Sequence, residues 1–112
     1  MPTRQSALDP VFKALADPTR RAVLAQLSGG PAAVKELAAP FDMKLPSFMQ
    51  HLRLLEDAEL VRSEKRGRVR TYELRPKQLR RVEDWLGAQR RLWERRLDQL
   101  DDYLLEMKEN DS

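Results

Sequence analysis

The sequence predicts a mainly α-helical domain that carries one β-hairpin and ends in a long helix. Three observations predict it. Apolar residues recur at helical spacing through most of the 112 residues. That spacing is replaced by strand-like alternation only once, over residues 60–74. A single helical pattern then runs from Pro76 almost to the end of the chain. With 41% hydrophobic and 35% charged residues, one modest core with charged helix surfaces is expected.

Two similar signals predict the starts of the first two helices. Asp9-Pro10 and Asp17-Pro18 each combine an acidic N-cap with proline at the first helical position. Gly29-Gly30-Pro31 ends the second helix. The apolar residues that follow the two starts at helical spacing are Leu8, Val11, Phe12 and Leu15, and then Val23, Leu24 and Leu27.

Two further helices with a short connection predict a helix-turn-helix. The first has Val34, Leu37, Ala38 and Phe41 on one face. The second begins at Pro46, and its buried stripe is Leu45, Phe48 or Met49, Leu52 and Leu55. This arrangement leaves Ser47, Gln50 and Arg53 on the opposite side. Such a helix fits the major groove of B-DNA and can present side chains to base edges.

A hairpin with a basic tip follows. Its predicted strands are Leu60–Lys65 and Val69–Leu74, joined by a turn at Arg66-Gly67-Arg68. Five basic residues and one acidic residue lie between Arg62 and Arg70. One interpretation is that these basic residues do no more than protect a solvated strand edge from pairing with another strand. Its place directly after a helix-turn-helix favours contact with DNA, as in a winged helix.

The last helix is expected to form a homodimer. Its apolar stripe extends for about 45 Å, longer than the small domain before it, so a second copy is the simplest cover. Trp85 and Trp93 could instead line an effector cavity. We expect a DNA-binding domain over 8–76, a dimerisation helix over 77–108, and disordered tails at 1–7 and 109–112. The predicted dimerisation residues are Leu86, Trp93, Leu97, Leu100 and Leu104.

Several classes of function are excluded by the residue inventory. The chain has no cysteine, one histidine (His51), and no glycine-rich phosphate loop, so an enzyme, a cofactor and a metal site are not expected. No apolar run approaches the length of a membrane-spanning helix, and the N-terminus lacks the apolar centre of a signal peptide. A cytoplasmic protein is therefore expected.

The motifs together resemble the ArsR/SmtB family of bacterial winged-helix repressors. The resemblance lies in Ala14-Leu-Ala-Asp-Pro-Thr-Arg-Arg-Ala-Val-Leu, in the helix-turn-helix ending Gln50-His-Leu-Arg-Leu-Leu-Glu-Asp-Ala, and in Arg66-Gly-Arg-Val-Arg-Thr-Tyr-Glu-Leu. It covers about residues 8–76. It implies a homodimeric regulator, usually a repressor, that binds an inverted-repeat operator in double-stranded DNA and dimerises through its terminal helices.

The chain departs from the family pattern at four places. Glu36-Leu-Ala-Ala-Pro has no thiol where metal-sensing members carry Cys-x-Cys, and the last helix has aspartates but no histidine. These two departures predict a non-metal branch, with any small-molecule effector left unidentified. Met49 stands where serine is common, so position 49 either contacts DNA or packs inward. Glu59 stands where the family has glycine before the first strand of the hairpin.

The predicted DNA contacts come from both motifs. His51 has either a structural, phosphate-neighbouring role or a direct DNA contact, and Ser47 either bonds the first-turn backbone or contacts DNA. The alternative function is a winged-helix dimer that serves as a protein-interaction module. The candidate DNA-binding residues are Ser47, Met49, Gln50, His51, Arg53, Lys65, Arg66, Arg68 and Arg70.

Overall fold

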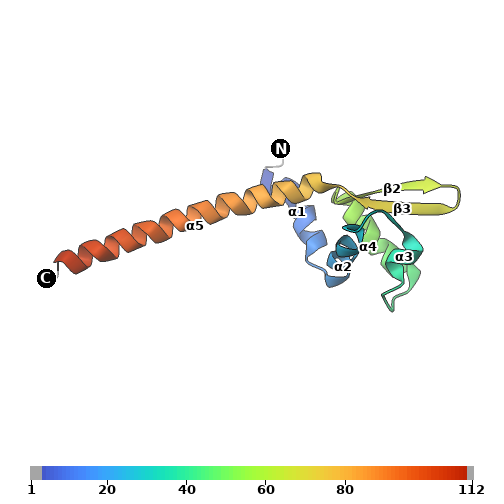
Figure 1. The fold of residues 1–112 in the computed structure, drawn as a ribbon, viewed down its shortest axis with the longest axis horizontal. Coiled ribbons are helices and arrows are strands. Elements are labelled where there is room, and N and C mark those ends of the chain that lie inside the picture. Colours follow the sequence, from blue (N-terminus) through green and yellow to red (C-terminus); the bar gives the residue numbers. More distant parts are fainter. Residues whose placement is uncertain (1–3, 111–112) are drawn as a thin grey trace. The chain divides into compact units, whose positions relative to one another are not determined.

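The computed structural model describes residues 4–110 and confirms the mainly helical fold with a small antiparallel sheet (Figure 1). The chain forms two compact units divided between Arg80 and Arg81. In chain order the elements are α1 (Arg4–Leu15), α2 (Pro18–Leu27), β1 (Ala32–Ala33), α3 (Val34–Ala38), α4 (Leu45–Asp57), β2 (Val61–Arg66), β3 (Val69–Leu74) and α5 (Pro76–Asn110).

The start of α1 differs from the sequence prediction. The helix begins at Arg4, so Pro10 lies inside it, and residues 4–7 are helical where a tail was expected. An internal proline removes one hydrogen bond of the helix. The buried residues Leu8, Val11 and Ala14 continue one apolar face across that position, and their packing explains why the helix persists. Residues 1–3 of the expected tail lie outside the described residues.

The start of α2 is as predicted. Asp17 is its N-cap in an extended conformation, and its side chain accepts a hydrogen bond from the Arg20 backbone N–H at 3.1 Å. Pro18 occupies the first helical position. Local capping therefore defines this helix start, which is also the point where α2 approaches α4.

The packing of α4 shows that Phe48, and not Met49, belongs to the buried stripe. Phe48, Leu52 and Leu55 are buried, whereas Met49 is half-buried. The prediction that Leu45 belongs to the buried stripe is wrong, because Leu45 is 57% exposed. As the first residue of the helix, Leu45 lies before the turn that packs on the core.

The sheet has three strands in the order β1-β3-β2, all antiparallel. The predicted hairpin is present, with β3 at its predicted bounds, β2 one residue later than predicted, and Gly67 at φ 62° in the turn. Strand β1 was not predicted, because two alanines carry no strand signal. It forms by pairing Ala32 with Tyr72 and Ala33 with Thr71.

Helix α5 runs without interruption through Gly87 and ends at Asn110, two residues beyond the predicted boundary. Residues 111–112 of the second expected tail lie outside the described residues. From residue 90 onward every residue of α5 is exposed in this single chain, its leucines and aromatic residues included. Of the helices in the described part of the chain, none combines the length and apolarity that crossing a membrane requires.

Candidate nucleic-acid interface

Helix α4 presents a polar surface on the side opposite its buried stripe. Ser47, Gln50 and Arg53 are all exposed. Among the described residues, Ser47 makes no hydrogen bond to the first-turn backbone, and the N-cap Lys44 provides no side-chain cap. The side chains of Gln50 and Arg53 likewise have no hydrogen-bond partner within residues 4–110. These three side chains are therefore available to an outside partner.

His51 is held within the protein instead. Its Nδ1 lies 3.0 Å from Arg20 Nη1 and 3.8 Å from the Asp17 carboxylate, and its side chain is 20% exposed. A guanidinium can only donate hydrogen bonds, so His51 Nδ1 accepts, and the ring proton of the neutral imidazole lies on Nε2. This geometry supports the structural role that the sequence left open.

Arg20 joins three helices at this point. Although it is charged, it is only 8% exposed. Its Nε donates to Ala14 O at 2.8 Å and its Nη2 donates to Lys13 O at 2.9 Å, which satisfies carbonyls at the end of α1. Its third bond reaches His51 on α4. Arg20 thus fixes α4 relative to α1 and α2, a role for which the sequence carried no signal.

The two faces of the hairpin carry different sets of cations. Side chains alternate between faces along a strand, and Lys65 pairs with Arg70 while Arg66 pairs with Val69. We call the face with Ser63, Lys65, Arg70 and Tyr72 the inner face. The outer face carries Arg62, Glu64, Arg66, Thr71 and Glu73.

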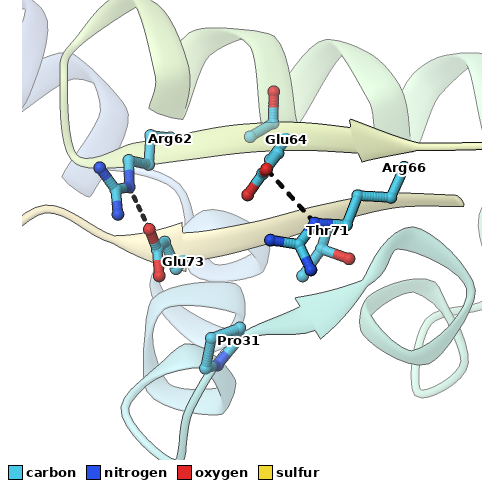
Figure 2. A pocket seen from close by; sticks show the side chains of 7 residues that line it. Pro31, Arg62, Glu64, Arg66, Thr71 and Glu73 are labelled. Atoms are coloured by element: carbon cyan, nitrogen blue, oxygen red, sulfur yellow. Dashed lines mark hydrogen bonds and ion pairs between the residues drawn. The ribbon is translucent and has the colours of Figure 1, made fainter.

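On the outer face the arginines are paired with carboxylates (Figure 2). Arg62 forms an ion pair with Glu73, and Arg66 Nε lies 3.3 Å from Glu64 Oε1. With Pro31 and Thr71 these residues line a hollow of about 530 Å³. Both arginines of the outer face therefore have a carboxylate partner on the same face.

On the inner face a hydrogen-bond chain links the hairpin to α4. Arg70 Nη1 donates to Ser63 Oγ at 2.8 Å, and Ser63 Oγ donates to Glu56 Oε1 at 2.8 Å. Burial and the nearby Glu56 charge raise the pKa of Tyr72, so this buried phenol stays neutral at physiological pH. The inner face of the hairpin is therefore the one that adjoins α4. The sequence had marked Arg70 but neither Ser63 nor Glu56.

Lys65 and Arg68 remain as unpaired cations. Both are exposed, and neither has a hydrogen bond or ion pair with another described residue. Lys65 lies on the inner face and Arg68 lies in the turn. Arg62, Arg66 and Arg70 each have a side-chain partner within the chain, whereas Lys65 and Arg68 have none among the described residues.

The chain is similar to known transcriptional regulators. Residues 15–64 match the helix-turn-helix domain family. The transcriptional repressor SdpR of Bacillus subtilis is 36% identical over 76 residues, which cover 68% of this chain and 84% of the repressor. The HTH-type transcriptional regulator Rv2034 of Mycobacterium tuberculosis is 44% identical over 68 residues, and the match covers 61% of this chain and 64% of that regulator.

Solved structures extend the similarity to most of the chain. A crystal structure of an ArsR family transcriptional regulator has a TM-score of 0.79 and 54% identity, and the match covers 84% of this chain and 97% of that one. An ArsR-like transcriptional regulator from Rhodococcus sp. RHA1 has the same TM-score, 0.79, at 29% identity, with 87% and 89% covered.

Proposed function

Since the chain belongs to the ArsR family of winged helix-turn-helix transcriptional regulators, we propose that it acts as a homodimeric repressor of an inverted-repeat operator. The family membership makes it a DNA-binding regulator. The dimer, the sign of regulation and the residue roles are the proposal. The observation that best supports the residue roles is the exposed polar face of α4 beside the inner face of the hairpin, joined by Glu56 and Ser63.

In this proposal α4 reads bases and the hairpin holds the backbone. The Gln50 amide can pair with adenine through two hydrogen bonds, and Arg53 can pair with guanine or a phosphate. Ser47, at the helix start, suits a phosphate contact. Lys65 and Arg68 contact phosphates or a narrow minor groove, and Arg70 contributes while bonded to Ser63. Met49 adds an apolar contact at the edge of the interface.

His51 takes a positioning role in the proposed interface. Its bond with Arg20 fixes one turn of α4 between the two side chains Gln50 and Arg53. The orientation of the reading helix then depends on a residue that itself makes no direct base contact. This assignment replaces the direct contact that the sequence had left as an alternative.

We also propose that the chain belongs to a branch that does not sense metals. It has no cysteine, and its one histidine already bonds Arg20 through Nδ1. Over residues 4–110, the structure brings together no group of three side chains from His, Asp and Glu that could hold a metal ion. Carboxylates alone would be a weak site for the transition metals that such repressors sense.

The dimer is expected to form through α5. Leu86, Trp93, Leu97, Leu100 and Leu104 are each more than half exposed in the single chain. Such a continuous apolar stripe is unfavourable in water and favours association. A two-fold dimer could also place two copies of α4 about 34 Å apart, which suits successive major grooves.

The central experiment measures binding of the full chain to DNA. Fluorescence anisotropy titrations would compare a duplex footprinted upstream of its own gene with a scrambled duplex, at several salt concentrations. Gln50→Ala should cost about 1–3 kcal/mol on the specific duplex and little on the scrambled one. Gln99→Ala, an exposed amide on α5, is the matched control and should change neither affinity. Equal, salt-independent binding of both duplexes by the native chain would favour a protein-interaction module instead.

A further inference from the structure

A group of cations at the base of the hairpin has no role in the proposed DNA interface. Four basic side chains and one acidic side chain line a hollow of about 340 Å³ where β3 passes into α5. We propose that this hollow binds a small anion that carries a phosphate group. Such a site would be independent of the proposed repressor function. The charged residues of its wall are Arg62, Glu73, Arg75, Lys77 and Arg80.

Three of the four cations have no partner in the part of the chain that the structure describes. Glu73 is the one acidic residue of the wall, and it already forms an ion pair with Arg62. The side chains of Arg75, Lys77 and Arg80 make no hydrogen bond or ion pair with any of residues 4–110. The first turn of α5 contains no acidic residue that could neutralise them. An excess of three positive charges therefore faces one hollow.

Arg75 shows most clearly that this charge is uncompensated. It is half-buried, whereas Lys77 and Arg80 are exposed. The Arg75 backbone N–H donates to Leu60 O at 2.9 Å, which fixes the chain just after β3, and the residue forms part of the wall of the hollow. Partial removal of a guanidinium from water is unfavourable when no acceptor replaces the water. A bound anion would supply that acceptor.

The size and charge of the hollow favour a phosphate group over a carboxylate. A volume of about 340 Å³ is at the low end for ligand pockets, so the ligand is compact. A phosphate monoester carries nearly two negative charges at neutral pH and has three strong acceptor oxygens, which suits several unpaired donors. Guanidinium groups can donate two parallel hydrogen bonds to phosphate. A carboxylate has a single charge and would leave most of the excess unmatched.

The hollow and the reading surface of α4 belong to opposite faces of the hairpin. Arg62 and Glu73 lie on the outer face, whereas the hydrogen bond from Ser63 to Glu56 joins the inner face to α4. DNA held by α4 would therefore approach the inner face. For this reason the phosphate group that we assign to the hollow is that of a free small molecule, and not that of the DNA backbone.

Backbone amide NMR of the full chain tests the site, with inorganic phosphate as the probe. Phosphate would replace chloride at constant ionic strength. The amide signals of residues 75–80 should shift and reach saturation, and acetate should bind more weakly. Lys77→Gln with Arg80→Gln changes two exposed side chains and should raise the dissociation constant for phosphate about tenfold or more. The matched control, Lys13→Gln with Lys35→Gln, removes the same charge from exposed residues outside the hollow and should leave phosphate binding unchanged.

A second variant tests the half-buried cation. Arg75→Gln should weaken phosphate binding by a similar factor, while amide signals away from the hollow keep their native positions. Shifts that increase linearly over the whole surface without saturation would overturn the site. Saturable binding that the control variant weakens equally would also overturn it. Acetate binding as tight as that of phosphate would overturn the assignment of the ligand class.

Titrations with scrambled DNA separate a free phosphate ligand from the DNA backbone. Lys77→Gln with Arg80→Gln should leave the salt slope of DNA binding unchanged. A slope lowered by about 0.9 for each lost contact would assign the hollow to the DNA backbone and overturn the small-molecule site. A chain that binds phosphate in the hollow but binds no operator would contradict the proposed function alone.

Discussion

At the residue scale, single side chains at helix ends position the reading helix. Asp17 caps α2 and lies beside His51, and Glu59 ends α4 just before the hairpin. Neither residue is among the expected DNA contacts. Their effects should therefore appear first in the free energy of unfolding and only secondarily in DNA binding.

Replacing Asp17 should destabilise the fold in a pH-dependent manner. Partial burial opposes ionisation of this carboxyl, but the Arg20 backbone N–H bond and neighbouring positive charge lower its pKa overall. A carboxyl with a lowered pKa in the folded state stabilises the protein above its unfolded pKa, and the contribution is lost as the pH falls through the folded pKa. Asp17→Ala should cost about 1 kcal/mol at pH 7.

Asp17→Asn is the matched control, because asparagine retains the cap without the charge. Urea unfolding at pH 7 should place it between the native chain and Asp17→Ala. Once the pH has fallen through the lowered folded-state pKa of Asp17, the native chain and Asp17→Asn should have the same stability. A difference between them that persists unchanged at low pH would show that ionisation of Asp17 is not involved.

Glu59→Gly should stabilise the protein. Glu59 has φ 59°, a left-handed conformation that favours glycine. It follows the C-cap Ala58, and the Glu59 and Leu60 N–H groups donate to Glu56 O and Leu55 O, the two bonds of a Schellman motif. Relief of the left-handed strain is worth about 1 kcal/mol.

Glu59→Ala provides the comparison for this prediction, since it removes the charge and keeps the Cβ. Urea unfolding should show Glu59→Gly as more stable than both Glu59→Ala and the native chain. If the alanine and glycine variants were equally stable, the backbone conformation would not be the source of the strain. The position thus also explains the family glycine that this sequence replaces.

At the scale of elements, the hairpin and α4 act as one surface because the Ser63 hydroxyl connects them. Ser63 receives a hydrogen bond from Arg70 and donates one to Glu56. Both of these hydrogen bonds lie on the inner face of the hairpin. The contribution of each basic residue to DNA binding should therefore depend on its face, and not only on its charge.

Two double variants with the same loss of charge test that dependence. Lys65→Ala with Arg68→Ala should weaken binding to operator and scrambled DNA alike, and should lower the salt slope by about 0.9 for each lost phosphate contact. Arg62→Ala with Arg66→Ala should have a smaller effect, because those side chains are paired with Glu73 and Glu64. Anisotropy titrations at several salt concentrations measure both. Identical losses would mean that only the overall positive charge matters.

At the scale of the whole molecule, DNA binding should depend on α5 even though α5 carries none of the proposed base contacts. Binding to an inverted repeat requires two copies of α4 held at a defined separation. The affinity for an operator should then fall when the apolar stripe of α5 is disrupted, although each DNA-binding unit remains folded.

Leu97→Glu should give monomers that bind operator DNA poorly. It places a charge within the apolar stripe, where association would desolvate it. Leu105→Glu is the matched control, since both leucines are 59% exposed but Leu105 lies about 100° around the helix from Leu104, outside the stripe of Leu97, Leu100 and Leu104. Sedimentation at micromolar concentration should separate the two variants. A dimeric Leu97→Glu chain, or an equally monomeric Leu105→Glu chain, would contradict the assigned stripe.

The sequence by itself determined those features that depend on neighbouring residues. The Asp17-Pro18 cap, the turn at Gly67 and the spacing of Phe48, Leu52 and Leu55 act within a few residues, so the helix-turn-helix and hairpin could be predicted. The long helix followed from the same reasoning. The start at Pro10 was misread because a local cap signal cannot reveal a preceding turn that packing stabilises.

The tertiary structure alone decided which side chains are free. His51 bonds Arg20 across 31 residues of sequence. The register of β2 and β3 places Lys65 on the inner face of the hairpin and Arg66 on the outer face. β1 likewise exists only because β3 offers it a partner. Contacts of this kind join segments that are distant in the chain. They arise from the packing of finished elements, which no local propensity encodes.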